Sequence, residues 1–319
     1  MKNYVRAGEV FPREGGRIVP TWDTLAPLPA ASAAGACMCA DERGTGRYIY
    51  VLLSLTSFWR YDSWTNAWNQ LTSPPAGGAF AAGTCMVYDP SRNYVWLLVP
   101  KVGANWACFY SYNCATDVWS ADLGAPAGLA AQWGTDGAMT HTCTTYNAAG
   151  NDDKIYLIGN AATAIHCYTV GVGWAALANP VPLACGAGCG ICWEWGINND
   201  KLLVMRGTAT ATFYDMVIST NTWSAALAIT GNVETFTTGS MAEYVPPKHW
   251  YISRDATTRI LRLDIAALAM GPARTFGGTH GGAIVGDGFV YMKSKSGRKY
   301  LYERIHTGTT FYRSMLGEA

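Results

Sequence analysis

Charged residues and helix-forming patterns are both scarce in this sequence. Asp, Glu, Lys and Arg make up only 14% of the 319 residues, and the formal net charge is +1. This balance provides no overall attraction to nucleic acid or anionic lipid, so no nucleic-acid partner is expected. A run of eighteen or more apolar residues is missing, and membrane insertion is therefore not expected either. Long amphipathic helical patterns are also missing, which leaves an all-β fold.

Motifs that carry catalysis are missing as well. The sequence contains no Gly-x-Ser-x-Gly, no phosphate-binding loop, no His-Glu-x-x-His and no Ser-x-Asp-x-Gly-x-Thr-Trp box. Its carboxylates fall mostly in turns, including Asp41 and Asp89, and no pair stands out as a general acid and base. We therefore assign no catalytic residue, expect no cofactor, and expect the protein not to be an enzyme.

The first residues lack the apolar stretch of a secretory signal. Without such a signal, ten cysteines favour synthesis in a reducing compartment and mostly free thiols. Half of the residues are hydrophobic, which is enough for a large core under a surface rich in Ala, Gly, Thr and Ser.

A repeat runs along nearly the whole chain. Tyr61-Asp62 leads to Thr65-Asn66-x-Trp68, and related copies end at Trp119, Trp174 and Trp223, with an early copy at Trp22. These Trp residues are separated by 46, 51, 55 and 49 residues, close to a kelch-like period of about 50. The Asp-x-x-Thr-Asn stretch is turn chemistry, because Asp accepts nearby backbone N–H groups and Asn tolerates left-handed geometry.

Aligned copies predict units of four antiparallel strands, the fourth of which carries the Trp. The second strands are nearly continuous apolar runs, as expected of strands covered on both faces: Tyr48–Leu53, Tyr94–Val99, Lys154–Ile158, Lys201–Met205, His249–Ser253 and Phe289–Met292. In the third unit, Thr142–Thr145 is assigned as the first strand. In the last unit, Gly282–Val285 is the first strand and Tyr300–Ile305 the third.

These units predict a single β-propeller over residues 21–319, preceded by an N-terminal arm over residues 1–20. Six blades fit the copies best, and seven is the alternative. The residues around Trp22 are expected to pair beside Tyr300–Ile305 as the outer strand of the last blade, which would close the ring and remove its edges. Phe311–Met315 competes for the same place.

The repeats resemble those of kelch-type β-propellers. The resemblance rests on Phe58-Trp59-Arg60-Tyr61-Asp62, on Thr65-Asn66-Ala67-Trp68 and on Leu71…Pro74-Pro75. It extends from about Trp22 to the C-terminus and implies the propeller architecture. The Gly-Gly pair that usually ends the second strand of a kelch repeat is replaced, for example by Leu53-Ser54.

Cys185, Cys189 and Cys192 form the sharpest local pattern and are weak candidates for a metal site. Cys192, however, lies in the same strand column as Cys37 and Cys85, where small residues fit the crowded centre of a ring. No metal is therefore assigned. A loop disulfide such as Cys185–Cys189 is the other interpretation left open.

Binding residues are sought among loop aromatics and basic side chains. Exposed aromatic rings serve sugar stacking or protein contacts, and a basic hairpin can meet an acidic partner. The candidates are Trp59, Trp64, Trp106, Trp133, Lys293, Lys295, Arg298 and Lys299. The arm, with Tyr4, Val10 and Phe11, is a candidate contact to a neighbouring subunit.

The function expected from the sequence is that of a non-enzymatic structural or interaction propeller in a larger assembly. A bacteriophage virion is the assembly that the composition favours, which would place the protein in the virion after synthesis in the host cytoplasm. Expected partners are other structural proteins of that assembly, together with a host-surface receptor or glycan. A lectin-like glycan binder and a metal-dependent enzyme are the alternatives, and cytoplasmic or secreted are the alternative locations.

Overall fold

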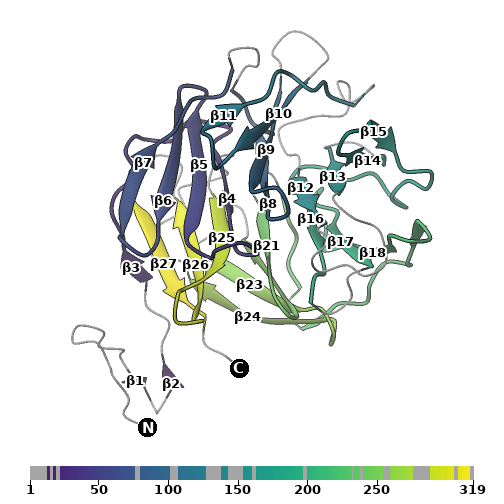
Figure 1. The fold of residues 1–319 in the computed structure, drawn as a ribbon. Coiled ribbons are helices and arrows are strands. Elements are labelled where there is room, and N and C mark those ends of the chain that lie inside the picture. Colours follow the sequence, from purple (N-terminus) through teal and green to yellow (C-terminus); the bar gives the residue numbers. More distant parts are fainter. Residues whose placement is uncertain are drawn as a thin grey trace.

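Each repeat unit forms an antiparallel sheet of four strands in the computed structural model, and the six sheets stand around a common axis (Figure 1). The structure describes residues 13–14, 17–18, 22–75, 80–100, 107–126, 138–142, 154–159, 163–196, 200–231, 233–237, 240–253, 259–275, 288–304 and 308–316. The predicted all-β, six-bladed propeller is thereby confirmed. Among these residues no helix could cross a membrane.

The strands of a blade follow one another from the axis outward. Blades 1 to 3 contain β4 (Cys37–Ala40), β5 (Tyr48–Ser54), β6 (Ser57–Asp62) and β7 (Ala67–Gln70); β8 (Cys85–Asp89), β9 (Tyr94–Pro100), β10 (Ala107–Asn113) and β11 (Val118–Trp119); and β12 (Ala138–His141), β13 (Lys154–Ile158), β14 (Ile165–Thr169) and β15 (Gly173–Ala176). Blades 4 to 6 contain β16 (Gly190–Trp193), β17 (Lys201–Met205), β18 (Phe213–Val217) and β19 (Thr222–Trp223); β21 (Met241–Val245), β22 (His249–Ser253), β23 (Arg259–Asp264) and β24 (Ala269–Thr275); and β25 (Gly288–Lys293), β26 (Lys299–Arg304), β27 (Phe311–Met315) and β3 (Trp22–Thr24). A short strand, β20 (Thr230–Gly231), adds to β24 in parallel.

The apolar second strands are covered on both faces, as predicted. Along β5, Ile49, Val51 and Leu53 pack toward blade 6. The alternate residues Tyr50 and Leu52 pack toward blade 2. Every hydrophobic cluster found among the described residues likewise joins two neighbouring blades. The core of this protein therefore lies between blades.

The repeated Tyr…Asn-x-Trp residues bind a blade to the chain that precedes it, as blade 1 shows. Asn66 has a φ of 54°, and its Oδ1 accepts hydrogen bonds from the Tyr61 hydroxyl at 2.7 Å and from the Ala26 amide at 2.9 Å. Trp68 donates from Nε1 to the Ala26 carbonyl at 3.0 Å and packs its ring on Phe311 of blade 6. We call this arrangement the inter-blade clasp.

The clasp recurs in the next blades. Asp117, with a φ of 58°, accepts from Tyr112 and from the Thr72 amide. Trp119 donates to the Thr72 carbonyl at 2.8 Å and packs on Phe58 of blade 1. The indoles of two further blades donate to the linkers before them: Trp174 to the Gly124 carbonyl at 2.9 Å and Trp223 to the Asn179 carbonyl at 3.0 Å. The signature thus forms the predicted turns and, in addition, positions the linkers between blades.

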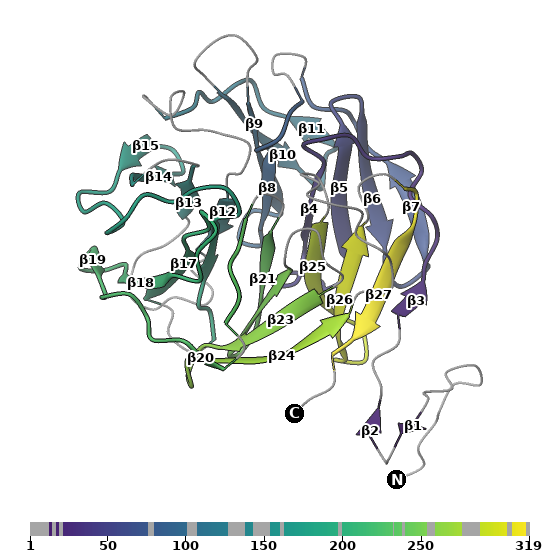
Figure 2. The same ribbon diagram turned by 180° about the vertical axis from the view of Figure 1, so that it is seen from behind.

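Pairing of the two ends of the chain closes the ring, as expected, but with a different neighbour for β3. The outer strand β3 pairs with β27, so that Arg313 faces Asp23, and β27 itself lies beside β26 (Figure 2). The N-terminal strand and Phe311–Met315 therefore do not compete for one place. Both are needed, because the last blade takes its third strand from one end of the chain and its fourth from the other.

Two first-strand assignments of the sequence analysis are wrong. In the last blade, the segment predicted as the second strand forms the inner strand β25, which lies between the inner strands β21 and β4. The segment predicted as the first, Gly282–Val285, is outside the described residues. In blade 3 the inner strand β12 ends at His141, and the predicted Thr142–Thr145 begins after it. Apolar inner strands are too short and too similar to one another for their order to be fixed by pattern alone.

The predicted arm is described only at β1 (Arg13–Glu14) and β2 (Arg17–Ile18), which pair with each other and are drawn away from the ring in Figures 1 and 2. Tyr4, Val10 and Phe11 lie outside the described residues, and their contact to a neighbouring subunit stays a prediction.

Replacing Asn66 with Ala should lower the free energy of unfolding by about 1–3 kcal/mol. Ala adopts the left-handed backbone conformation of this position less readily than Asn, and two hydrogen bonds to the Asn66 side chain are lost. The matched control is Asn69→Ala on the exposed outer strand, which should change stability by no more than about 0.5 kcal/mol. Urea denaturation of both variants measures the difference. Equal effects would contradict the role of the clasp.

Candidate functional site

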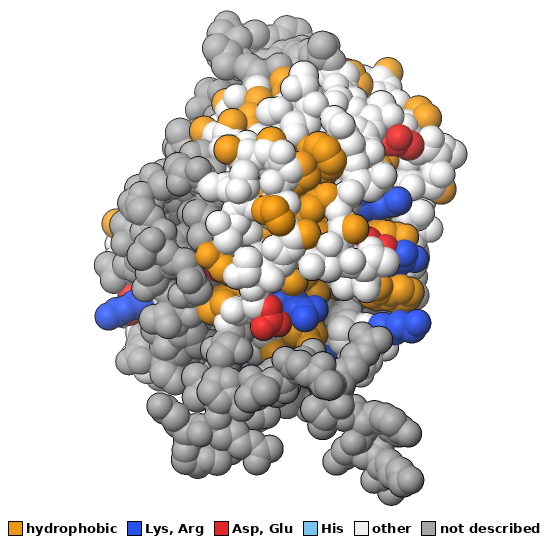
Figure 3. Space-filling view, turned by 90° about the vertical axis from the view of Figure 1, so that its left-hand side faces the viewer, with side chains coloured by type: hydrophobic (Ala, Val, Ile, Leu, Met, Phe, Trp, Pro, Cys, Tyr) orange, Lys and Arg blue, Asp and Glu red, His pale blue; other side chains and the backbone are white. Residues whose placement is uncertain are grey.

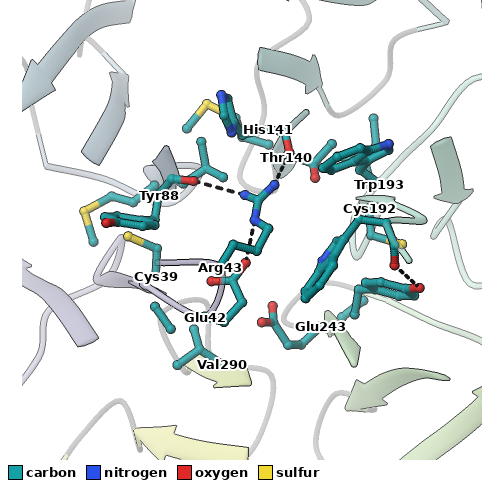
Figure 4. Close-up of a pocket in the computed structure, with 18 of the residues that line it drawn as sticks. Cys39, Glu42, Arg43, Tyr88, Thr140, His141, Cys192, Trp193, Glu243 and Val290 are labelled. Atoms are coloured by element: carbon teal, nitrogen blue, oxygen red, sulfur yellow. Dashed lines mark hydrogen bonds and ion pairs between the residues drawn. The ribbon is translucent and has the colours of Figure 1, made fainter. Parts of the chain in front are cut away.

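A polar cavity of about 110 Å³ lies on the axis of the propeller, where the six inner strands converge. Its lining includes residues of all six, from Cys39 on β4 to Val290 on β25 (Figure 4). Two carboxylates, a guanidinium group and several aromatic rings border the same space. No sequence motif indicates this site, because each inner strand contributes only one to three of its residues.

The loop between β4 and β5 places Glu42 and Arg43 in the cavity. Asp41 organises this loop: its carboxylate accepts from the amides of Arg47 and Tyr48 at 2.8 and 3.0 Å, and its carbonyl accepts from the Gly44 amide at 2.9 Å. Asp41 is thus a turn residue, as expected. It holds the next two side chains against the axis.

Arg43 bridges three blades. Its Nε donates to Glu42 at 3.0 Å, Nη1 donates to the His141 carbonyl at 2.8 Å, and Nη2 donates to the Tyr88 carbonyl at 3.1 Å. The guanidinium also lies 5.6 Å from the centre of the Trp193 ring of blade 4. Only 4% of the Arg43 side chain is exposed. Arg43 is therefore part of the wall, with each of its three nitrogens engaged by protein.

Glu243 on β21 is the second carboxylate of the cavity. Its Oε1 accepts a hydrogen bond from the Tyr291 amide at 3.0 Å. Burial and the nearby charge of Glu42 raise the pKa of Glu243 to about 8, against the opposing effects of the Tyr291 amide and Arg43. In Figure 4 the Glu42 carboxyl group points toward Arg43, and the carboxyl end of Glu243 lies on the same side of the cavity.

A second feature, on the surface, joins two of the predicted sets of residues. Trp64, at the turn between β6 and β7, is 43% exposed. Arg47 and Lys295 both lie over its ring, at 4.9 and 5.0 Å from the ring centre. Lys295 belongs to the β25–β26 hairpin of blade 6, so the two cations reach Trp64 from different blades. We call Arg47, Trp64 and Lys295, with Lys293 and Arg298 of the same hairpin, the seam surface.

The other predicted binding residues are placed elsewhere. Lys299 is half-buried and donates to the Pro246 carbonyl at 2.9 Å, which ties blade 6 to blade 5. Trp59 is packed against the core between blades 6 and 1 and donates to Ser57. Trp106 and Trp133 lie outside the described residues. The structure thus joins Trp64 to the basic hairpin and gives Trp59 and Lys299 packing contacts.

The three clustered cysteines are buried separately. Cys185 and Cys189 belong to the core between blades 3 and 4, whereas Cys192 faces the core between blades 4 and 5. None of the three forms a disulfide, so the disulfide interpretation is wrong, and burial raises the pKa of Cys185 to about 12. Within the described ranges, no three His, Cys, Asp or Glu side chains are grouped so that they could hold a metal ion.

Comparison with known proteins defines the class of fold. No protein-family model matches the sequence, and no curated protein matches it. Among solved structures, YjhT is similar over 91% of this chain and 96% of its own, with 11% identity and a TM-score of 0.59. A Bacteroides thetaiotaomicron protein of unknown function is similar over 93% and 76%, with 9% identity and a TM-score of 0.62. Streptogramin B lyase is similar over 93% and 98%, with 9% identity and a TM-score of 0.56. At such identities these similarities show the fold alone, and the six blades are those of this chain's own sheets.

Replacing Arg43 with Met should lower the free energy of unfolding by about 3 kcal/mol or more, since it leaves Glu42 unpaired and removes bonds to two carbonyl groups. Arg259→Met is the control, because Arg259 pairs with Glu234 at 3.0 Å but is 54% exposed; its loss should cost no more than about 1 kcal/mol. Chemical denaturation compares the two variants. A smaller loss for Arg43→Met than for Arg259→Met would contradict this account.

Glu243 should make stability fall as pH rises. Its pKa is raised from 4.5 to about 8, so the folded state holds the proton more tightly than the unfolded chain, and stability declines across that window. Glu243→Gln removes this contribution. Glu194→Gln is the control, because burial raises the pKa of Glu194 only to about 7. The stability of this variant should still fall between about pH 7 and pH 8. Urea denaturation across this pH range tests it, and an unchanged slope in Glu243→Gln would contradict it.

Proposed function

We propose that this protein is a non-catalytic interaction propeller that binds an acidic partner protein through the seam surface. The observation that carries this proposal is the exposed Trp64 ring with Arg47 and Lys295 over it, contributed by two blades. Aromatic and arginine side chains are the residue types that dominate binding energy in protein interfaces. A rigid ring holds their backbone in place, which reduces the conformational entropy lost on binding.

Local charge supports an acidic partner. The whole chain carries 23 basic and 22 acidic residues, so the cations of the seam surface are a local concentration. Lys293, Lys295 and Arg298 are all exposed. Arg47 is paired with Asp62, its Nε donating at 3.0 Å, and this holds its guanidinium beside Trp64. On the side of the molecule drawn in Figure 3, most of the described surface is uncharged; several Lys and Arg side chains lie along one edge, and others lie at the centre and at the opposite edge.

The finer assignments stay predictions. A place in a bacteriophage virion is suggested by composition, and the similar structures named above carry no indication of it. The kelch resemblance is likewise a resemblance of repeats. For a lectin, Trp64 offers a ring that already has two cations over it, which leaves the acidic partner as the better match. Proteomic analysis of purified particles tests the assembly role, and finding the protein only as a free monomer would contradict it.

Replacing Lys293 and Lys295 with Glu should weaken binding to an acidic protein segment, because attraction at the seam surface becomes repulsion. A labelled oligoglutamate peptide is the probe, measured by fluorescence anisotropy at low and at physiological salt. The double variant should weaken binding by about tenfold or more. The control is Lys248→Glu, at a hairpin of blade 5 where Lys248 pairs with Asp264 at 3.1 Å.

Heparin fragments and single-stranded DNA serve as competing probes. Tighter binding of either would overturn the choice of an acidic protein as partner. Failure of the peptide to bind, or equal weakening by Lys248→Glu, would overturn the role of the seam surface itself.

A further inference from the structure

The axial cavity has the composition of a cation site. Glu42 and Glu243 border it. After burial itself, the charge on Glu42 is the next largest cause of the raised pKa of Glu243. Four aromatic residues line the same space: Tyr88, Trp193, Trp195 and Tyr244. Carboxylates together with aromatic ring faces are the environment in which proteins hold organic cations.

Arg43 does not neutralise both carboxylates. Its three nitrogens donate to Glu42 and to the carbonyls of His141 and Tyr88, and its Cζ lies 5.6 Å from the centre of the Trp193 ring. The hydrogen bond found for Glu243 comes from a neutral backbone amide, that of Tyr291. The charge that would balance an ionised Glu243 is therefore missing from the cavity wall among the described residues.

The aromatic side of the cavity is held in place independently of any ligand. The Tyr244 hydroxyl bonds to the Trp195 carbonyl at 2.8 Å, and the two rings meet edge to face with centres 6.1 Å apart. These residues come from blades 4 and 5, whose inner strands are fixed by the packing between blades. A site whose walls are fixed in advance loses little entropy when it binds.

The geometry points to a binding site for a small primary amine, whose ammonium group lies between Glu42 and Glu243 and whose alkyl part contacts the aromatic side of the axial cavity. An ammonium group supplies three hydrogen-bond donors and one positive charge, which matches two carboxylates of which one is already paired. A cavity of about 110 Å³ limits the ligand to a few heavy atoms. A divalent metal fits less well, because the described residues offer no group of three ligating side chains.

Binding should release a proton. Glu243 has its pKa raised to about 8, so near neutral pH it is largely protonated in the empty cavity. An ammonium group beside it favours the ionised carboxylate, and the proton leaves to the buffer. Proton release therefore reports that the amine lies at this carboxyl group and not elsewhere on the surface.

Ethanolamine is the probe, titrated into the full-length protein by calorimetry near neutral pH in two buffers of different ionisation enthalpy, neither a primary amine. Binding with proton release is expected, whereas acetamide and acetate, similar in size but neutral and anionic, should not bind. Glu243→Gln should weaken ethanolamine binding by about tenfold to a hundredfold. Glu194→Gln, which changes another buried Glu outside the cavity lining, should bind normally.

The site is refuted if ethanolamine produces no binding signal with folded protein, if acetate binds in its place, or if Glu243→Gln binds equally well. Should Glu243→Gln fail to fold, the two-buffer titration of the unmodified protein decides, because binding without proton release overturns the assignment. The Lys293 and Lys295 reversals should leave ethanolamine binding unchanged, so this test is independent of the seam surface.

Discussion

Packing between blades is the constraint on which the rest of this structure depends. A four-stranded sheet whose second strand is apolar on both faces cannot bury those faces alone, so each blade requires a neighbour on either side. The clusters containing Ile49 and Tyr50 show this directly, since successive residues of one strand belong to two different cores. A row of such blades would leave an apolar face exposed at each end unless the row closes into a ring. Pairing of β3 with β27 provides that closure, because it joins the two ends of the chain within one blade.

Closure in turn determines what happens at the axis. Six inner strands bring their ends together, and any polar side chain placed there loses most of its water. Arg43 is tolerated because Glu42 and the backbone carbonyls of two neighbouring blades supply acceptors for it. Glu243 receives a single amide, and the unfavourable burial of its charge is expressed in a raised pKa. The axial cavity is therefore a consequence of the ring, and its chemistry follows from one loop and one inner strand.

The repeated and the unrepeated residues have different tasks. Asn66, Asp117 and the indoles that follow them appear in successive blades, and each binds a linker in the same way. Residues found in one blade only, such as the Glu42-Arg43 pair and Trp64, do not bind a linker. They line the axial cavity and the seam surface. The copies build the scaffold, and the differences between copies provide the surfaces that can bind.

The sequence by itself determined the all-β class, the number of blades and the position of most strands, because a period near 50 and apolar second strands are local patterns. It also singled out Trp64 and the basic hairpin, since exposed aromatic and basic residue types can be recognised in isolation. Only the tertiary structure decided that these two meet, that Phe311–Met315 and Trp22 share one blade, and that Glu42 and Glu243, some 200 residues apart in the chain, border one cavity. The physical reason is that ring closure brings together segments distant in sequence, and packing between blades, which no local pattern encodes, sets which side chains then face one another.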